Sequence, residues 1–233
     1  MIPKTIHYCW FGGKPLPENV KAYMDTWHRH FPDFKIKQWD EGNFDVNAME
    51  YTRQAYYAKK FAFVSDVARL FALVSEGGLY LDTDILVKRP FPAEWFELDG
   101  FGSFEHDSYV ETGLIASCAG NKFIKSFLDS YSDISFFKGL LFDMTTNVMR
   151  FTTHMRNVGF IMNNQLQTVN SFRLFPQQLL CGKDWQTGRY DDDQTYAVHD
   201  YAGTWGKDAL SHRMKHLCSA AACVLKWHLK ELR

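Results

Sequence analysis

A passage from helix to strand in the first third of the chain constrains the fold most. Residues 63–76 carry apolar side chains at helical spacing, and the Gly77-Gly78 pair that follows is typical of a helix end. Leu79-Tyr80-Leu81 then begins an apolar run that predicts a buried strand. The chain therefore enters a sheet directly from a helix, which is typical of α/β proteins.

The same alternation recurs along the chain. Strand-like runs are expected at residues 5–11, 34–39, 85–87, 102–105, 112–117 and 171–175. Helical patterns are expected at residues 18–30, 48–60, 122–131 and 145–156. This order predicts one α/β domain with a mostly parallel central sheet and helices on both faces.

Composition narrows the function classes. A chain of 233 residues with 46% hydrophobic residues suits a single domain with a large core. The net charge of -1 argues against a nucleic-acid partner, which usually requires a basic surface. Five scattered cysteines without a CxxC pair indicate reduced thiols rather than zinc ligands. With no signal-like start and no apolar run of ~20 residues, the expected location is cytoplasmic.

Asp82 and Asp84 follow the apolar run directly. If the backbone there is extended, residues i and i+2 point to the same side, so the two carboxylates converge. Two like charges repel unless a cation lies between them, and hard oxygen ligands suit Mg²⁺ or Mn²⁺. Such an ion can hold a diphosphate and neutralise its charge as it leaves. An Asp-x-Asp triplet alone is also common in surface turns.

Asp66 and Arg69 lie on the helix that precedes this strand. Their spacing of three places them on one helical face. The pair is either an ordinary intrahelical ion pair or a recognition site for sugar or ribose hydroxyls, in which the carboxylate accepts and the guanidinium donates.

Three segments carry a family resemblance: residues 2–12 (IPKTIHYCWFG), residues 65–69 (SDVAR) and residues 77–84 (GGLYLDTD). In this order and spacing they resemble family-32 glycosyltransferases, which include bacterial capsule enzymes and yeast mannosyltransferases and are distantly similar to clostridial glucosylating toxins. The resemblance resumes at residues 199–205 (HDYAGTW).

The resemblance implies a GT-A fold, a Mn²⁺ or Mg²⁺ cofactor and a nucleotide-sugar donor, with UDP as the expected nucleotide. It also implies a role for each matching residue. Trp10 stacks on the base, and Asp66, Arg69 and Tyr80 hold the donor sugar. Asp82 faces the ribose or sugar and the water shell of the ion, and Asp84 binds the metal. His199 is a metal or diphosphate ligand, and Trp205 lies near the phosphates. Without the resemblance, a strand tryptophan such as Trp10 is more often a core residue, and a single histidine such as His199 is more often a surface or core residue than a ligand.

The chain departs from the family pattern at Glu111-Thr112-Gly113, where an Asn-Gly pair is usual. Glu111 is therefore a candidate catalytic carboxylate beside the anomeric carbon. The resemblance implies retention of anomeric configuration, either by double displacement through such a nucleophile or by front-side attack. The sequence leaves both routes open.

The expected activity is transfer of a sugar to a glycan or lipid-linked acceptor in capsular polysaccharide synthesis. Two alternatives are a haloacid-dehalogenase-like phosphatase, whose nucleophilic Asp also follows an apolar strand, and a non-catalytic sugar-binding module. In the phosphatase fold, the strand opens directly into a helix.

We divide the chain into a catalytic domain, residues 1–209, and a basic amphipathic helix, residues 210–233. One predicted stripe of that helix is apolar: Leu210, Met214, Leu217, Ala221, Leu225, His228 or Leu229, and Leu232. The stripe either closes the domain core or rests on the anionic inner face of a membrane, which would make the protein peripheral there.

Overall fold

The computed structural model describes residues 1–106, 108–183, 193–201 and 210–231. Its helices are α1 (Glu18–His30), α2 (Glu50–Tyr57), α3 (Phe61–Glu76), α4 (Lys122–Asp129), α5 (Asn147–Asn157), α6 (Gln177–Leu180), α7 (Leu210–Glu231) and the 3-10 helix η1 (Ala93–Glu97). The strands of the first half are β1 (Thr5–Cys9), β2 (Lys35–Trp39), β3 (Gly78–Leu81), β4 (Ile85–Val87), β5 (Gly100–His106), β6 (Tyr109–Val110) and β7 (Leu114–Ser117). The later strands are β8 (Phe137–Lys138), β9 (Leu141–Phe142), β10 (Gln167–Val169), β11 (Phe172–Phe175) and β12 (Ala197–His199).

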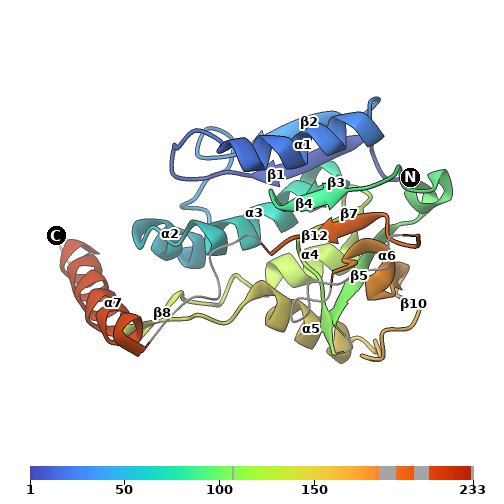
Figure 1. Ribbon diagram of the computed structural model, residues 1–233. Coiled ribbons are helices and arrows are strands. Elements are labelled where there is room, and N and C mark those ends of the chain that lie inside the picture. Colours follow the sequence, from blue (N-terminus) through green and yellow to red (C-terminus); the bar gives the residue numbers. More distant parts are fainter. Residues whose placement is uncertain (107, 184–192, 202–209, 232–233) are drawn as a thin grey trace.

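A central sheet in the order β10-β11-β5-β7-β3-β1-β2 organises the fold (Figure 1). Strands β2, β1 and β3 are parallel, and β11 is parallel to β5. Strand β7 runs antiparallel to both β3 and β5, so β5 has the same direction as β3. Most strands of the described sheet therefore share one direction, and the predicted α/β class with a mostly parallel sheet is confirmed.

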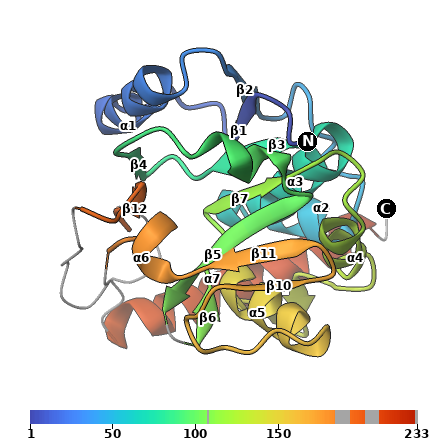
Figure 2. The ribbon, with the colours of Figure 1, turned by 90° about the vertical axis from the view of Figure 1, so that its right-hand side faces the viewer.

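The two faces of the sheet carry separate apolar clusters. In β3, Tyr80 belongs to the cluster shared with α2, α3, α4 and α5, while Leu79 and Leu81 belong to the cluster shared with α1, η1 and α6. The alternation follows from the two-residue repeat of a strand. The end view shows helices on both sides of the sheet (Figure 2), as the sequence predicted.

The glycine pair between α3 and β3 has the predicted role. Gly77 ends α3 with φ 66°, a left-handed conformation that glycine adopts without steric cost. A Cβ at Gly78 would lie 2.5 Å from the Thr5 carbonyl oxygen. Beside it, His7 Nε2 donates to the Gly77 carbonyl over 2.7 Å, a contact that joins β1 to the end of α3.

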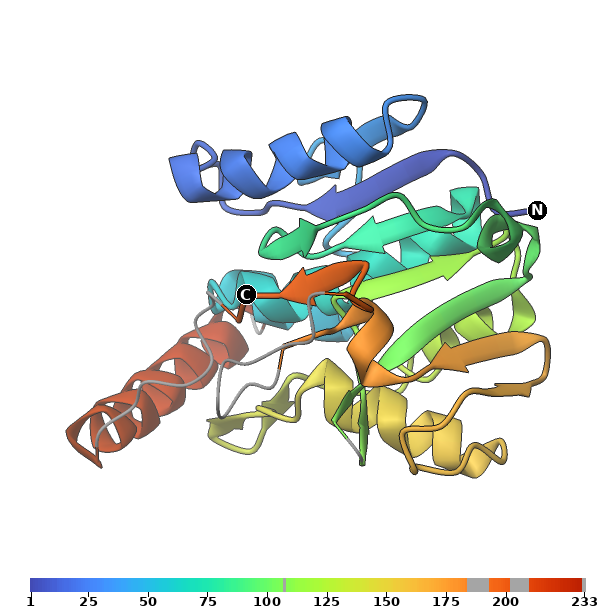
Figure 3. The ribbon, with the colours of Figure 1, turned by 45° about the vertical axis from the view of Figure 1, so that its right-hand side comes forward.

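The short strands β4 and β12 bring a late segment of the chain, residues 197–199, to the end of β3. After β3 the chain passes through a turn into β4, which pairs antiparallel with β12. Figure 3 shows β12 lying beside the end of β3, more than a hundred residues away in sequence. In the haloacid-dehalogenase fold the strand with the nucleophilic Asp leads into a helix. Here β3 leads into the strand β4, which argues against that alternative.

The C-terminal helix differs from its predicted pattern. In the described side chains of α7, the buried residues are Ala220, Val224 and Trp227, and the last two join the core cluster. Leu225 and Leu229, from the predicted stripe, are 52% and 63% exposed. Trp227 packs against α2, because the centroid of its ring lies 4.9 Å from that of Tyr57, and this contact turns the Trp227 side of α7 toward the core. No helix among the described residues has both the length and the hydropathy of a membrane span.

Candidate active site

The Asp-x-Asp triplet forms a turn at the end of β3. The Ile85 amide donates to the Asp82 carbonyl over 3.0 Å, and the Asp82 amide donates to the Gly113 carbonyl over 2.7 Å. The expectation of extended backbone is therefore wrong, since residues 82–84 reverse the chain direction. The turn still brings the carboxylates together, because ligand atoms of Asp82, Asp84 and His199 all lie within 4.8 Å of one another.

Arg69 joins the helix to the turn. Its guanidinium contacts Asp66 Oδ1 at 3.0 Å and Asp82 Oδ2 at 3.2 Å, and donates to the Thr112 carbonyl over 2.6 Å. The Arg69 side chain is only 6% exposed. The structure thus contains the intrahelical pair that the sequence allowed, and it extends that pair to Asp82.

Asp82 is fixed from both sides. The Tyr80 hydroxyl donates to Asp82 Oδ1 over 2.7 Å, while Arg69 occupies the other oxygen. Burial raises the pKa of Asp66 to about 7, more than the nearby Arg69 charge lowers it, and Asp66 Oδ2 has no hydrogen-bond partner among the described residues. Tyr80 is itself buried, and its hydroxyl group contacts Asp82.

His199 reaches the site on β12. It pairs with Ile85 in register, directly after the turn. Its Nε2 lies 3.2 Å from Asp84 Oδ1, and its Nδ1 lies 2.9 Å from Glu111 Oε2. Burial would lower the pKa of His199, but Glu111 and Asp84 together raise it well above its ordinary value.

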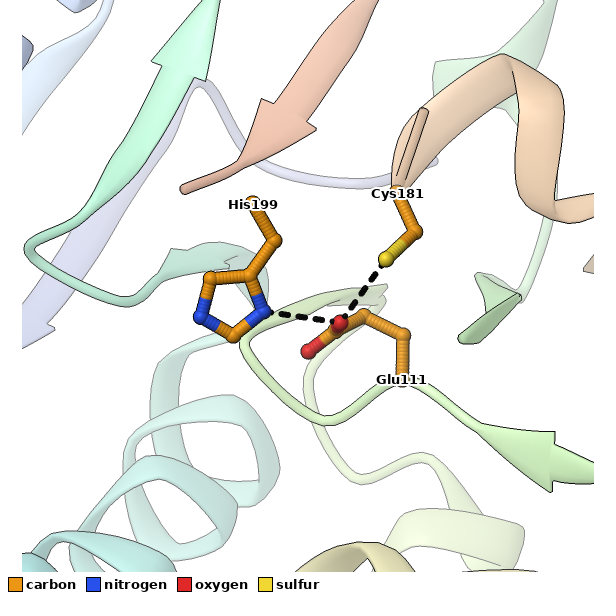
Figure 4. Close-up of side chains that lie close together, drawn as sticks. All are labelled: Glu111, Cys181 and His199. Carbon is orange, nitrogen blue, oxygen red and sulfur yellow. Dashed lines mark hydrogen bonds and ion pairs between the residues drawn. The ribbon is translucent and has the colours of Figure 1, made fainter. Parts of the chain in front are cut away.

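Glu111 lies behind His199, away from solvent. It is 1% exposed, its Oε1 accepts from the Gly113 amide, and its Oε2 also accepts from Cys181 Sγ over 3.2 Å (Figure 4). Burial alone would raise the pKa of Glu111, but the His199 charge and these hydrogen bonds lower it to about 2. The side chain is therefore an ionised acceptor that bonds within the protein on both oxygens.

The donor set fits a hard divalent cation. Carboxylate oxygens and an imidazole nitrogen are ligands that Mn²⁺ accepts. Because both Asp82 oxygens already accept hydrogen bonds, Asp84 and His199 are better placed as direct ligands.

The expected roles of two further site residues, Trp10 and Trp205, stay predictions. Trp10 is half-buried, and its indole Nε1 donates to the Lys14 carbonyl over 2.6 Å, which leaves open its expected role in base stacking. Trp205 lies outside the described residues. The structure therefore brings together Asp66, Arg69, Tyr80, Asp82, Asp84, Glu111 and His199.

Sequence reasoning missed several supporting residues. Gly113 contacts Asp82 and Glu111 through its backbone, and Cys181 holds Glu111. Asp200 donates its amide to the Asp84 carbonyl over 3.0 Å, and its carboxylate is held by Tyr23 and Lys183. A glycine directly before an apolar strand was the available signal for Gly113; Cys181 had none.

A pocket of about 590 Å³ lies outside the carboxylate cluster. It is lined by Gly12, Asn47, Arg53, Tyr56, Tyr57, Lys59, Phe61, Trp227, Lys230 and Glu231. Gly12 follows β1, and Phe61 begins the helix that carries Asp66 and Arg69. None of the clustered carboxylates lines this pocket.

Comparison with known proteins identifies part of the chain. Residues 17–101 match the glycosyltransferase sugar-binding region containing the DXD motif. An uncharacterised glycosyltransferase of Acanthamoeba polyphaga mimivirus is 30% identical over 38% of this chain and 38% of its own length. Subversion of eukaryotic traffic protein A of Legionella pneumophila is 25% identical over 55% of this chain and 25% of its length.

The chain thus spans a quarter to about two fifths of the length of these two relatives. Two solved glycosyltransferase structures are also similar to it. PaToxG is 22% identical, and the match covers 67% of this chain and 68% of PaToxG with a TM-score of 0.46. GlyE of Streptococcus pneumoniae is 11% identical, and the match covers 97% of this chain and 63% of GlyE with a TM-score of 0.49. The predicted resemblance to DXD glycosyltransferases is confirmed.

Proposed function

We propose, from the premise that residues 17–101 are a DXD sugar-binding region, that this chain is a metal-dependent glycosyltransferase using a nucleotide-sugar donor, with UDP as the nucleotide. The observation that carries the proposal is the convergence of Asp82, Asp84 and His199 at the end of β3. Such a cluster is unnecessary for a non-catalytic sugar-binding module.

The residues divide into two groups. Asp84 and His199 hold the cation, which when bound neutralises charge on the departing diphosphate. Arg69 and Tyr80 fix Asp82 toward the donor, and Asp66 orients Arg69. Stacking of the base on Trp10 and a position for Trp205 near the phosphates complete the proposed donor site.

We propose that the anomeric configuration of the sugar is retained. The acceptor attacks from the front side of the sugar, without a covalent intermediate on Glu111. A nucleophile must reach the anomeric carbon. Glu111 is buried and both its oxygens accept hydrogen bonds within the protein. This geometry supports a role for Glu111 other than attack on the sugar.

The proposed function is tested by incubating the purified chain and Mn²⁺ with UDP-glucose, UDP-galactose, UDP-N-acetylglucosamine and GDP-mannose. One donor should raise the melting temperature, since a ligand at 100 times its Kd stabilises by about 2.7 kcal/mol. The same donor should be hydrolysed slowly to free nucleotide in a reaction that EDTA stops. Absence of both effects for every donor would contradict the proposal.

The acceptor proposed is a glycan or lipid-linked glycan of a capsular polysaccharide, used at an anionic membrane face on the cytoplasmic side. The support is the outer face of α7, where Leu225 and Leu229 are exposed beside Lys226 and Lys230. In this view α7, in the 210–233 segment, packs on the 1–209 catalytic domain through Val224 and Trp227 and turns its outer face to the membrane.

The membrane proposal predicts that the chain floats with phosphatidylglycerol vesicles and not with phosphatidylcholine vesicles. Leu225→Ser with Leu229→Ser should abolish flotation without changing the melting temperature, because both side chains are exposed. These substitutions are sharper than truncation, which would also remove the packing of Val224 and Trp227. An intact chain that stays at the bottom of the gradient would exclude membrane binding.

A further inference from the structure

The contact between Glu111 and His199 joins two parts of the chain that lie 88 residues apart. Glu111 directly precedes the segment that leads into β7, and His199 ends β12. The two imidazole nitrogens face different partners: Nε2 faces Asp84 and Nδ1 faces Glu111. Since a carboxylate oxygen accepts hydrogen bonds, the 2.9 Å contact between Nδ1 and Glu111 Oε2 places a hydrogen on Nδ1.

From this arrangement we infer that Glu111 is a positioning residue for His199, holding the ring so that Nε2 is free to bind the metal beside Asp84. The inference rests on the proposed function for the metal itself. Histidine ligands commonly donate their second nitrogen to a carboxylate, which fixes the tautomer and ring orientation. In this role Glu111 does not touch the sugar.

The surroundings of Glu111 explain how the carboxylate is held. The Gly113 amide occupies Oε1, and Cys181 Sγ shares Oε2 with His199 Nδ1. Cys181 is fully buried and its pKa is raised by burial, so it remains a neutral thiol donor. The Gly113 amide, the Cys181 thiol and the His199 imidazole thus all donate to one carboxylate, and Figure 4 shows the last two contacts.

Glutamine at position 111 would break this arrangement without changing its shape. Its amide has one acceptor oxygen and one NH₂ group, whereas Gly113 and His199 Nδ1 are both donors. If the oxygen accepts from Gly113, the NH₂ group faces Nδ1 and favours the tautomer with hydrogen on Nε2. That tautomer cannot bind a metal through Nε2.

The test measures Mn²⁺ binding directly by electron paramagnetic resonance, without donor. Glu111→Gln should weaken Mn²⁺ binding about 10- to 100-fold, the usual effect of removing a carboxylate behind a histidine ligand. Pulsed electron paramagnetic resonance detects an imidazole nitrogen bound to Mn²⁺. This nitrogen signal should weaken in Glu111→Gln and be lost in His199→Ala. Glu97→Gln is the matched control: it makes the same change at an exposed glutamate of η1, outside the site, so Mn²⁺ affinity should stay close to wild type.

Donor hydrolysis separates positioning from nucleophilic attack. Saturating Mn²⁺ should restore most of the Glu111→Gln activity if Glu111 acts through His199, and none if Glu111 attacks the sugar. Circular dichroism and melting temperature check that the variants fold. Wild-type Mn²⁺ affinity in Glu111→Gln, or equal losses in Glu97→Gln, overturns the inference. Wild-type protein that shows no imidazole-bound Mn²⁺ would instead contradict the proposed metal site.

Discussion

Asp84→Ala is expected to lower sugar transfer and donor hydrolysis by about 1,000-fold or more. The variant loses the carboxylate best placed to hold the cation, and charge neutralisation by a metal contributes several kcal/mol, with each ~1.4 kcal/mol worth tenfold in rate. Asp84 is the stronger candidate of the pair because both oxygens of Asp82 already accept hydrogen bonds. Rates with and without EDTA, and Mn²⁺ affinity by paramagnetic resonance, measure the effect.

The fold should survive this substitution. The Asp84 side chain is 18% exposed, and its removal relieves repulsion from Asp82. Asp25→Ala is a matched control, since Asp25 is an exposed carboxylate on α1 that does not belong to the Asp82–Asp84–His199 cluster. It should keep wild-type activity. An Asp84→Ala protein that transfers sugar at the wild-type rate, with unchanged response to EDTA, would remove Asp84 from the metal site.

Local patterns were sufficient to predict the first half of the site. Asp66 and Arg69 share a face because of helical spacing, and the glycine pair marks where α3 gives way to β3. These relations span few residues, so the sequence contains them directly. The backbone of Asp82–Asp84 was mispredicted because a hydrogen bond from Ile85 closes a turn that an apolar run followed by carboxylates does not signal.

Long-range contacts could not be predicted in the same way. Glu111 and Cys181 are 70 residues apart, and no periodicity connects a lone glutamate to a lone cysteine. His199 was found only through the family resemblance; β12 brings it to the site by pairing with β4. The buried face of α7 was predicted wrongly because two neighbouring stripes of the helix have similar apolar patterns. The stripe that contains Trp227 is the buried one, and Trp227 packs against Tyr57.

Gly113→Ala is the second substitution with a large expected effect, and it adds a single methyl group. Its Cβ would lie 2.8 Å from Asp82 Oδ2, 2.8 Å from Glu111 Oε1 and 3.2 Å from His199 Cε1. The first two distances are too short for real contacts, so the side chains on both sides must move. Displacement of reacting groups by about 1 Å can cost about 100-fold in rate, and we expect a loss of at least that size.

The effect should be local to the site. Gly113 is not among the residues with positive φ, so alanine can adopt its backbone conformation without strain. Gly102→Ala is the matched control, because its Cβ would meet Phe172 at 3.4 Å, an ordinary packing distance, away from the carboxylates. Gly102→Ala should retain activity and Mn²⁺ affinity. Gly113→Ala should lose both while keeping its circular dichroism spectrum, since the added methyl group separates Asp82, Glu111 and His199 rather than the strands that carry them. Wild-type turnover and Mn²⁺ affinity in Gly113→Ala would show that the close packing of these three side chains is not needed for activity.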